Sequence, residues 1–235
     1  MNPARRSASP SRGATLVALA VLFAAPTARA QDADVTKAQV QQAIDRATAY
    51  LKGAAAADGS YRGRMAPAYP QGVAALACYA LLVAGVPEKD PVIQASLAYI
   101  KACPLDKTYS VGLAALALAE AGPAHRPALA ACARWLEKAL LPTGMYTYVD
   151  AGRAGQVGDN SNTQFGVLGL WASARGGVPI QAATWAKVRE YFRGAQNRDG
   201  TWGYNPGGGG SPTMTMAGIA SLLIASGQMR RPGPE

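Results

Sequence analysis

The sequence predicts an all-α fold made of helical hairpins, in which amphipathic helices alternate with helices that are apolar on every side. Along one set of segments, apolar residues recur at steps of three and four, which is typical of helices with one buried face. The segments between them are rich in Ala, Leu and Val all round, as buried helices are. No segment has the strict alternation of a half-buried strand, so we expect no sheet.

We expect four amphipathic helices, each followed by an apolar helix. The amphipathic helices are expected at residues 39–55, 92–102, 127–141 and 182–195, and the apolar helices at 72–84, 110–121, 163–175 and 214–226. Glycine, alone or with proline nearby, follows each apolar helix and is a stop signal. These stops are Gly85, Gly122, Gly176-Gly177 and Gly227. The alternation is what an α/α toroid requires, with inner helices lining the core and outer helices wrapping them.

A turn pattern recurs after the amphipathic helices and indicates stacked repeats. After the last of them, Tyr191 is followed by Gln196, Asp199-Gly200 and Trp202. Glycine adopts positive φ readily, the Gln196 amide can satisfy backbone groups, and Trp202 offers a large face for packing. The same spacing recurs as Tyr50, Gly59 and Tyr61, and again as Trp135, Gly144 and Tyr146. A weaker copy begins at Tyr99 and has Thr108 in the glycine position.

This spacing, with the basic Lys187 before Tyr191, resembles the QW motif of squalene and terpenoid cyclases and of the wider prenyltransferase and squalene-oxidase repeat superfamily. The resemblance covers residues 39–228 and implies a toroid. A full toroid of that superfamily has six hairpins, so the four expected here imply a partial one. Such an arc either curls into a smaller bundle, is covered by a partner, or is a truncated product. We favour truncation or self-association.

Residues 1–30 have the pattern of a signal peptide: a basic start, an apolar run over 14–25, and the small-x-small sequence Ala28-Arg29-Ala30. The apolar run is too short to span a bilayer by itself, so we favour cleavage over an uncleaved anchor. We expect a secreted or periplasmic protein with no stable membrane span after cleavage. A polar leader (31–38), the repeat domain (39–228) and a polar tail (229–235) would then follow.

The charge of the chain indicates whether nucleic acid is a partner. The net charge is +9, and removing the four arginines of residues 1–30 leaves +5, without the clustered basic face that binds nucleic acid. We therefore expect no nucleic-acid partner.

Cys78 lies in an expected buried helix, while Cys103 and Cys132 are offset by about 10 Å along equivalent helices. That separation exceeds the reach of a disulfide, so none is expected.

The strongest candidate site is the stretch Asp159-Asn160-Ser161-Asn162-Thr163, followed by Gln164. It resembles the Asp-x-Asp-Asp-Thr motif of squalene-type cyclases, whose middle Asp donates the proton that starts cyclisation. Ser161 occupies that middle position and Asn162 the next, so only Asp159 carries over and the resemblance does not extend to the reaction. Asp, Asn, Ser and Thr are also preferred helix caps. Two interpretations stay open: a structural cap, or a polar site formed by Asp159, Ser161, Asn162 and Gln164.

The sequence gives little support for a metal site, a cofactor or an aromatic-lined cavity. The single histidine, His125, lies in a Gly-Pro-Ala-His-Arg-Pro turn without cysteine at ligand spacing, so we interpret it as a surface residue and expect no metal and no cofactor. Among the expected inner helices, the aromatics Tyr79, Phe165 and Trp171 are interpreted as core packing. Long glycine-rich loops over 146–162 and 205–213 are expected at one end of the fold.

The sequence thus predicts a non-catalytic binding or scaffold module that contacts a protein partner or a second copy through its open repeat edges. The alternative is an enzyme of the cyclase or α/α-barrel class with a cavity-mouth site around Asp159.

Overall fold

The computed structural model describes residues 35–149 and 157–230, and within these ranges the chain is all-α, as predicted. The described part holds eight α-helices and one 3-10 helix, η1 (Pro123–His125). The α-helices are α1 Lys37–Ala54, α2 Pro70–Val83, α3 Pro91–Ala102, α4 Thr108–Ala121, α5 Arg126–Ala139, α6 Asn160–Arg175, α7 Ala182–Gly194 and α8 Pro212–Met229. Each coincides with an expected helix. The predicted signal peptide and the end of the tail lie outside the described residues.

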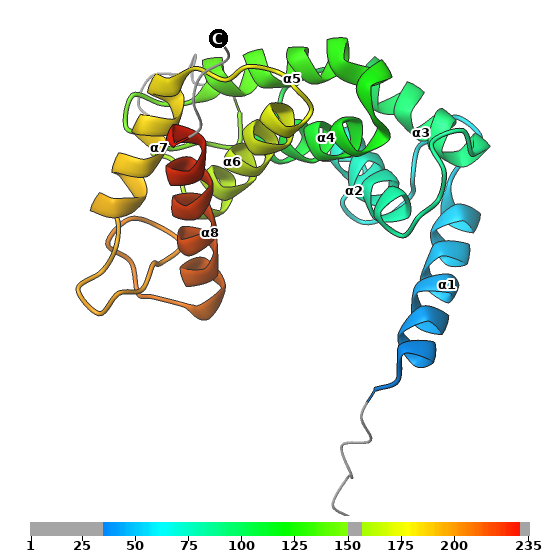
Figure 1. Ribbon diagram of the computed structural model, residues 1–235, viewed down its shortest axis with the longest axis horizontal. Coiled ribbons are helices and arrows are strands. Elements are labelled where there is room, and N and C mark those ends of the chain that lie inside the picture. The colour runs from blue at the N-terminus through cyan, green and yellow to red at the C-terminus, as the bar shows by residue number, and fades with distance from the viewer. Residues whose placement is uncertain (1–34, 150–156, 231–235) are drawn as a thin grey trace, which may run out of the picture.

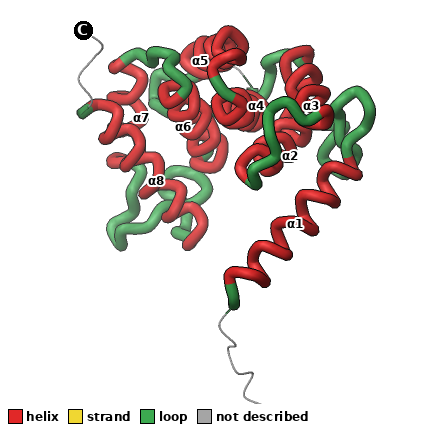
Figure 2. The backbone as a smooth tube through the Cα atoms, turned by 45° about the vertical axis from the view of Figure 1, so that its right-hand side comes forward, coloured by secondary structure: helices red, strands yellow, loops and turns green. Residues whose placement is uncertain are grey.

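The helices are arranged as an arch (Figure 1). The apolar helices α2, α4, α6 and α8 pack one on the next along the inside of the arch, with α4 against both α2 and α6 and α6 against α8. Helices α3, α5 and α7 lie along the outside, and Figure 2 shows the same order from a second direction. Burial follows this order, because the central helix α4 is buried on most of its surface while α2 and α8 each leave apolar side chains exposed.

Glycine permits close contact between α4 and α6. A Cβ on Gly112 of α4 would lie 2.5 Å from the carbonyl oxygen of Phe165 in α6. A Cβ on Gly169 of α6 would lie 2.8 Å from the Cα of Gly112. The two backbones therefore approach more closely than any residue with a side chain would allow at these points.

The three predicted glycine turns have the same backbone geometry. Gly59, Gly144 and Gly200 have φ values of 83°, 85° and 85°, in the region that favours glycine. In each turn the glycine N–H donates to the carbonyl three residues earlier, and the N–H of that earlier residue donates to the carbonyl just after the glycine. The N–H donors of the second bond are Ala56, Leu141 and Asn197, and the carbonyl acceptors are Ser60, Met145 and Thr201, respectively. The Gln196 side chain donates to the Gly200 carbonyl at 2.9 Å.

The aromatic residue two positions after each turn glycine is buried. Trp202 donates its indole N–H to the carbonyl of Phe192 at 2.9 Å, and Tyr146 donates its hydroxyl to the equivalent carbonyl of Leu136, also at 2.9 Å. Each ring lies against a glycine of the following inner helix, Gly218 for Trp202 and Gly166 for Tyr146. The turn is thereby fixed to both helices of its hairpin.

Two of the turns also contact the next outer helix. A Cβ on Gly59 would overlap the carbonyl group of Ala95 in α3, and a Cβ on Gly144 would overlap that of Lys187 in α7. Ala95 and Lys187 occupy the same position of the repeat, four residues before the aromatic. Among the described residues, Gly200 has no such neighbour, since its Cβ would come within 4 Å only of its own turn residue Gln196.

Helix α1 departs from the expectation that outer helices wrap inner ones. It points away from the rest of the arch (Figures 1 and 2) and contains no buried residue. Its expected core face is exposed, with Ile44 37% and Tyr50 74% accessible. Its main tie to the body is Lys52, whose ammonium lies 2.6 Å from the carboxylate of Asp90, the N-cap of α3.

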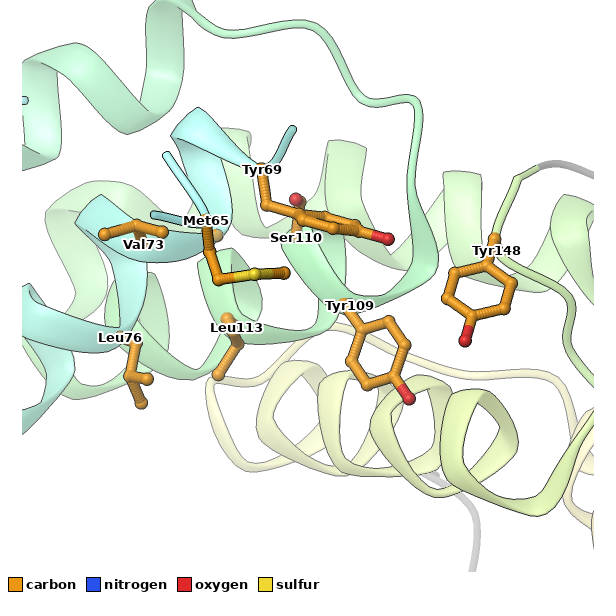
Figure 3. Close-up of a pocket in the computed structure, with 9 residues that line it drawn as sticks. Met65, Tyr69, Val73, Leu76, Tyr109, Ser110, Leu113 and Tyr148 are labelled. Atoms are coloured by element: carbon orange, nitrogen blue, oxygen red, sulfur yellow. The ribbon is translucent and has the colours of Figure 1, made fainter. Parts of the chain in front are cut away.

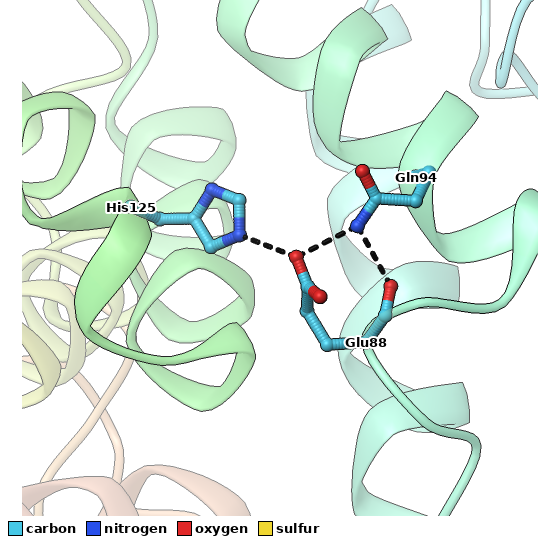
Figure 4. A network of polar contacts seen from close by, with 3 residues as sticks. All are labelled: Glu88, Gln94 and His125. Carbon is cyan, nitrogen blue, oxygen red and sulfur yellow. Dashed lines mark hydrogen bonds and ion pairs between the residues drawn. The ribbon is translucent and has the colours of Figure 1, made fainter.

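Two further expectations were wrong. Gly227 does not stop α8, because it lacks the positive φ found at Gly85, Gly122 and Gly177, and the helix continues to Met229. His125 is not a surface residue. Its side chain is 8% exposed and its Nε2 lies 3.0 Å from Oε1 of Glu88, which also accepts from Gln94 (Figure 4). This contact joins the loop after α2 to the turn after α4.

The three cysteines are free. Burial raises the pKa of the Cys78 and Cys132 thiols to about 12, so both stay protonated near neutral pH. Protonated, buried thiols are poor nucleophiles.

Candidate functional site

The stretch that begins at Asp159 caps α6. The Asp159 carboxylate accepts from the backbone N–H of Asn162 at 2.8 Å and from its side-chain amide at 2.7 Å. Thr163 donates its hydroxyl to the Asp159 carbonyl and accepts from the N–H of Tyr146. Asp159, Asn162 and Thr163 are all buried. The capping interpretation is confirmed, although α6 begins at Asn160 and so includes Ser161, Asn162 and Thr163 in its first turn.

The first residue of α6 holds the next loop in place. Asn160 donates its side-chain amide to the Gly203 carbonyl at 2.8 Å, and its N–H donates to the Tyr204 carbonyl at 2.9 Å. Thr108, the first residue of α4, does the same one hairpin earlier. The Thr108 hydroxyl donates to the Thr147 carbonyl, and the Thr108 N–H donates to the Tyr148 carbonyl. We call these paired contacts the loop straps. They place the loops before α6 and α8 at the same end of the fold, as predicted.

The four candidate site residues therefore separate into two groups. Asp159 and Asn162 are bonded to each other in the cap. Ser161 lies on another side of α6, where its hydroxyl accepts from the Tyr109 hydroxyl at 2.6 Å. Gln164 is half-buried one turn further on. A catalytic carboxylate needs a free oxygen directed at its substrate, and both Asp159 oxygens instead accept hydrogen bonds from α6.

Replacing Asp159 tests the cap. Asp159→Ala removes both hydrogen bonds and should lower the free energy of unfolding by about 2 kcal/mol, measured by urea denaturation. Asp159→Asn should lower it by less than half as much, because asparagine also caps helices. The neighbouring Asn162 Oδ1, which has no partner, can accept from the new amide after a side-chain flip. Equal losses in the two variants would contradict this account and would indicate that the charge itself is required.

A pocket of about 350 Å³ opens beside α2 and α4 (Figure 3). Its wall is apolar and aromatic, and none of the described residues lines it with a carboxylate or ammonium group. The lining residues are Met65, Tyr69, Gly72, Val73, Leu76, Tyr109, Ser110, Leu113 and Tyr148. Its volume is within the range of small-molecule sites.

Tyr109 is the centre of the aromatic wall. Its ring lies 4.6 Å from Phe165, 5.8 Å from Tyr148 and 6.4 Å from Tyr69, between ring centroids. The Tyr148 hydroxyl lies 3.0 Å from that of Tyr204, so the aromatic wall continues into the loop before α8. These rings come from two inner helices and three loops, and the loop straps hold two of those loops together.

Two hydroxyls of this wall, those of Tyr109 and Tyr204, have raised pKa values. Burial raises the pKa of Tyr109, although the hydrogen bond with Ser161 acts in the opposite direction. The hydrogen bond with Tyr148, together with partial burial, raises the pKa of Tyr204. Neither group ionises near neutral pH, so each offers a hydrogen bond rather than a base.

The sequence interpretation missed this wall. It named Tyr79, Phe165 and Trp171 as the inner aromatics and began the second inner helix at Ser110, which left Tyr109 in a loop. In the structure Trp171 is half-buried under the guanidinium of Arg175, 4.7 Å from the ring centroid, while Phe165 joins the wall. The signal was present as a tyrosine at the start of each inner helix or in the loop before it: Tyr69, Tyr109, Tyr148 and Tyr204.

Comparison of the chain with known proteins does not assign a function to it. No protein-family model matches the chain, and no curated protein matches it. Residues 35–149 and 157–230 contain no group of three or more His, Cys, Asp or Glu side chains placed to hold a metal ion. None of the helices in these ranges has the length and apolar character needed to cross a membrane.

Proposed function

We propose that the chain is an exported repeat protein of the α/α-toroid class that serves as a non-catalytic binding module. The observation that carries this proposal is the tyrosine-walled pocket, which combines a large apolar surface with a few hydroxyl groups. Such a surface suits an apolar or aromatic group, since aromatic walls provide contact area and stacking. Its lining includes no acid–base pair. The nearest candidate acid, Asp159, is engaged in the α6 cap.

The toroid class is supported by the three equivalent turns, by the row of inner helices and by the outer helices that cover it. Export is supported by the pattern of residues 1–30. The alternative, an enzyme with a site at Asp159, would need that carboxylate to leave the cap and reach the pocket.

The binding proposal is tested with a neutral apolar fluorescent probe, N-phenyl-1-naphthylamine, titrated into the chain. Leu76→Glu places a carboxylate on the pocket wall, so we expect the affinity for the probe to fall at least about tenfold, because an apolar ligand would desolvate the charge. Val83→Glu is the matched control, since it makes the same change at an exposed position of the same helix outside the lining. Equal weakening by both variants, or by neither, would overturn the assignment of the pocket as the binding site.

A further inference from the structure

Helix α1 carries the same apolar face as the other outer helices, and most of that face is uncovered among the described residues. Ile44 and Ala47 are exposed, while Leu51 packs partly against the core. In the repeat, Ile44, Ala47 and Leu51 correspond to residues that are at most 4% exposed in the other outer helices. These counterparts are Ile93, Ser96 and Ile100 in α3, Leu129, Cys132 and Leu136 in α5, and Trp185, Val188 and Phe192 in α7. The face of α1 therefore has the composition of a buried contact.

Two of the three buried outer helices show what covers such a face. Helices α3 and α5 pack chiefly on the inner helices that precede them, α2 and α4, whereas α7 packs chiefly on α8. The Gly59 turn of the first hairpin also lies against Ala95 of α3. The Gly144 turn lies against Lys187 of α7 in the same way. An outer helix is thus received by the glycine turn of the hairpin before it. In α1 the position equivalent to Ala95 and Lys187 is Arg46.

The hairpin α7–α8 has the same kind of surface, a glycine turn beside an inner helix, and none of the described outer helices packs against that turn. The Gly200 turn has the same geometry as the other two, yet no helix lies against it. Beside it, α8 exposes Met216, Ile219 and Leu223, which lie on one stripe at steps of three and four. Helix α8 contains no charged residue, so covering it would bury no unpaired charge. Figure 1 shows α1 and α8 at opposite ends of the arch.

We propose that α1 of one chain docks on the α7–α8 hairpin of a second copy, with the backbone at Arg46 against the Gly200 turn. Within one chain, an outer helix already lies against a glycine turn twice, at Gly59 and at Gly144. The free turn at Gly200 and the uncovered helix α1 are the two surfaces of a third such contact, so we take the occupant to be α1 of another copy. The contact joins two different surfaces, so it is head-to-tail and generates either a closed ring or an open chain of copies. The tyrosine-walled pocket plays no part in it.

The test uses two variants of the whole chain and light scattering after gel filtration. Ile44→Glu changes the α1 face, and the double variant Ile219→Glu/Leu223→Glu changes the α8 stripe. Every substituted side chain is exposed in the single copy, so both variants should fold, which circular dichroism and a cooperative urea transition would verify. Gln42→Glu, on another side of α1, is the matched control. The unaltered chain and Gln42→Glu should form a species of two or more copies, and each of the other variants should be a monomer.

Mixing the two monomeric variants tests whether the contact between copies is head-to-tail. An equimolar mixture of the two monomeric variants should form a dimer and nothing larger, because the mixture offers one intact α1 face and one intact α8 face for each pair. A monomeric unaltered chain at every concentration reached would overturn the proposal. So would a mixture that stays monomeric, an α8 variant that assembles like the unaltered chain, or an undefined aggregate that persists in both variants.

Discussion

Replacing Trp202 with alanine should lower the free energy of unfolding by about 3–5 kcal/mol, the range for large aromatic-to-alanine changes in a core. The indole is 2% exposed, lies against Gly218 of α8 and donates to the Phe192 carbonyl at the end of α7. The substitution therefore opens a cavity between the helices of the last hairpin and leaves a buried carbonyl without its donor. Urea denaturation followed by circular dichroism measures the loss.

Trp202→Phe separates the two contributions. Phenylalanine keeps an aromatic ring at this position but removes the indole N–H and part of the ring volume, so we expect a loss of about 1–2 kcal/mol. A loss in Trp202→Ala no larger than in Trp202→Phe would show that the ring does not pack as described.

Replacing Gly144 with alanine should destabilise the chain by about 3 kcal/mol, from two additive causes. At φ 85° any L residue other than glycine adopts the left-handed region at a cost of about 1–2 kcal/mol. The new methyl group would also overlap the Lys187 carbonyl and approach the Cβ of Tyr191 in α7, so α7 would have to shift.

Gly200→Ala is the matched control for Gly144→Ala, because Gly200 has the same φ and no neighbouring helix in the single copy. We expect only the backbone cost of about 1–2 kcal/mol there. Both are best measured in the Ile44→Glu background, so that docking between copies does not contribute. Equal losses at the two glycines would contradict the packing of the Gly144 turn on α7.

The features that were predictable from the sequence are those with short-range causes. The eight helices followed from apolar periodicity and from stop signals, and the three positive-φ glycines followed from a repeated spacing. The cap at Asp159 followed from residue type. Gly227 failed as a stop because glycine is only a weak local preference, and here it remains within α8, which continues to Met229.

The features that were not predictable depend on contacts between distant segments. Tyr109 and Tyr148 lie in one wall because the strap at Thr108 holds the start of α4 against a loop some forty residues later in the chain. His125 is buried because Glu88 meets it across two hairpins. The close contact at Gly112 and Gly169 depends on how two helices cross, which periodicity does not encode. The exposed face of α1 has the sequence pattern of a buried one, so only the arrangement reveals it.

The loop straps have a consequence for how the arch behaves under strain. Because Thr108 and Asn160 each hold the loop of the following hairpin, the end of one unit is anchored inside the structure of the unit before it. If the last hairpin were pulled away from its end of the arch, the buried Asn160 amide of its neighbour would lose its partner, and the neighbour would be weakened in turn. Stacked helical units are often separable, each stable enough to be added or removed. Here the three hairpins from α3 to α8 are interlocked, so they are expected to open together rather than one by one.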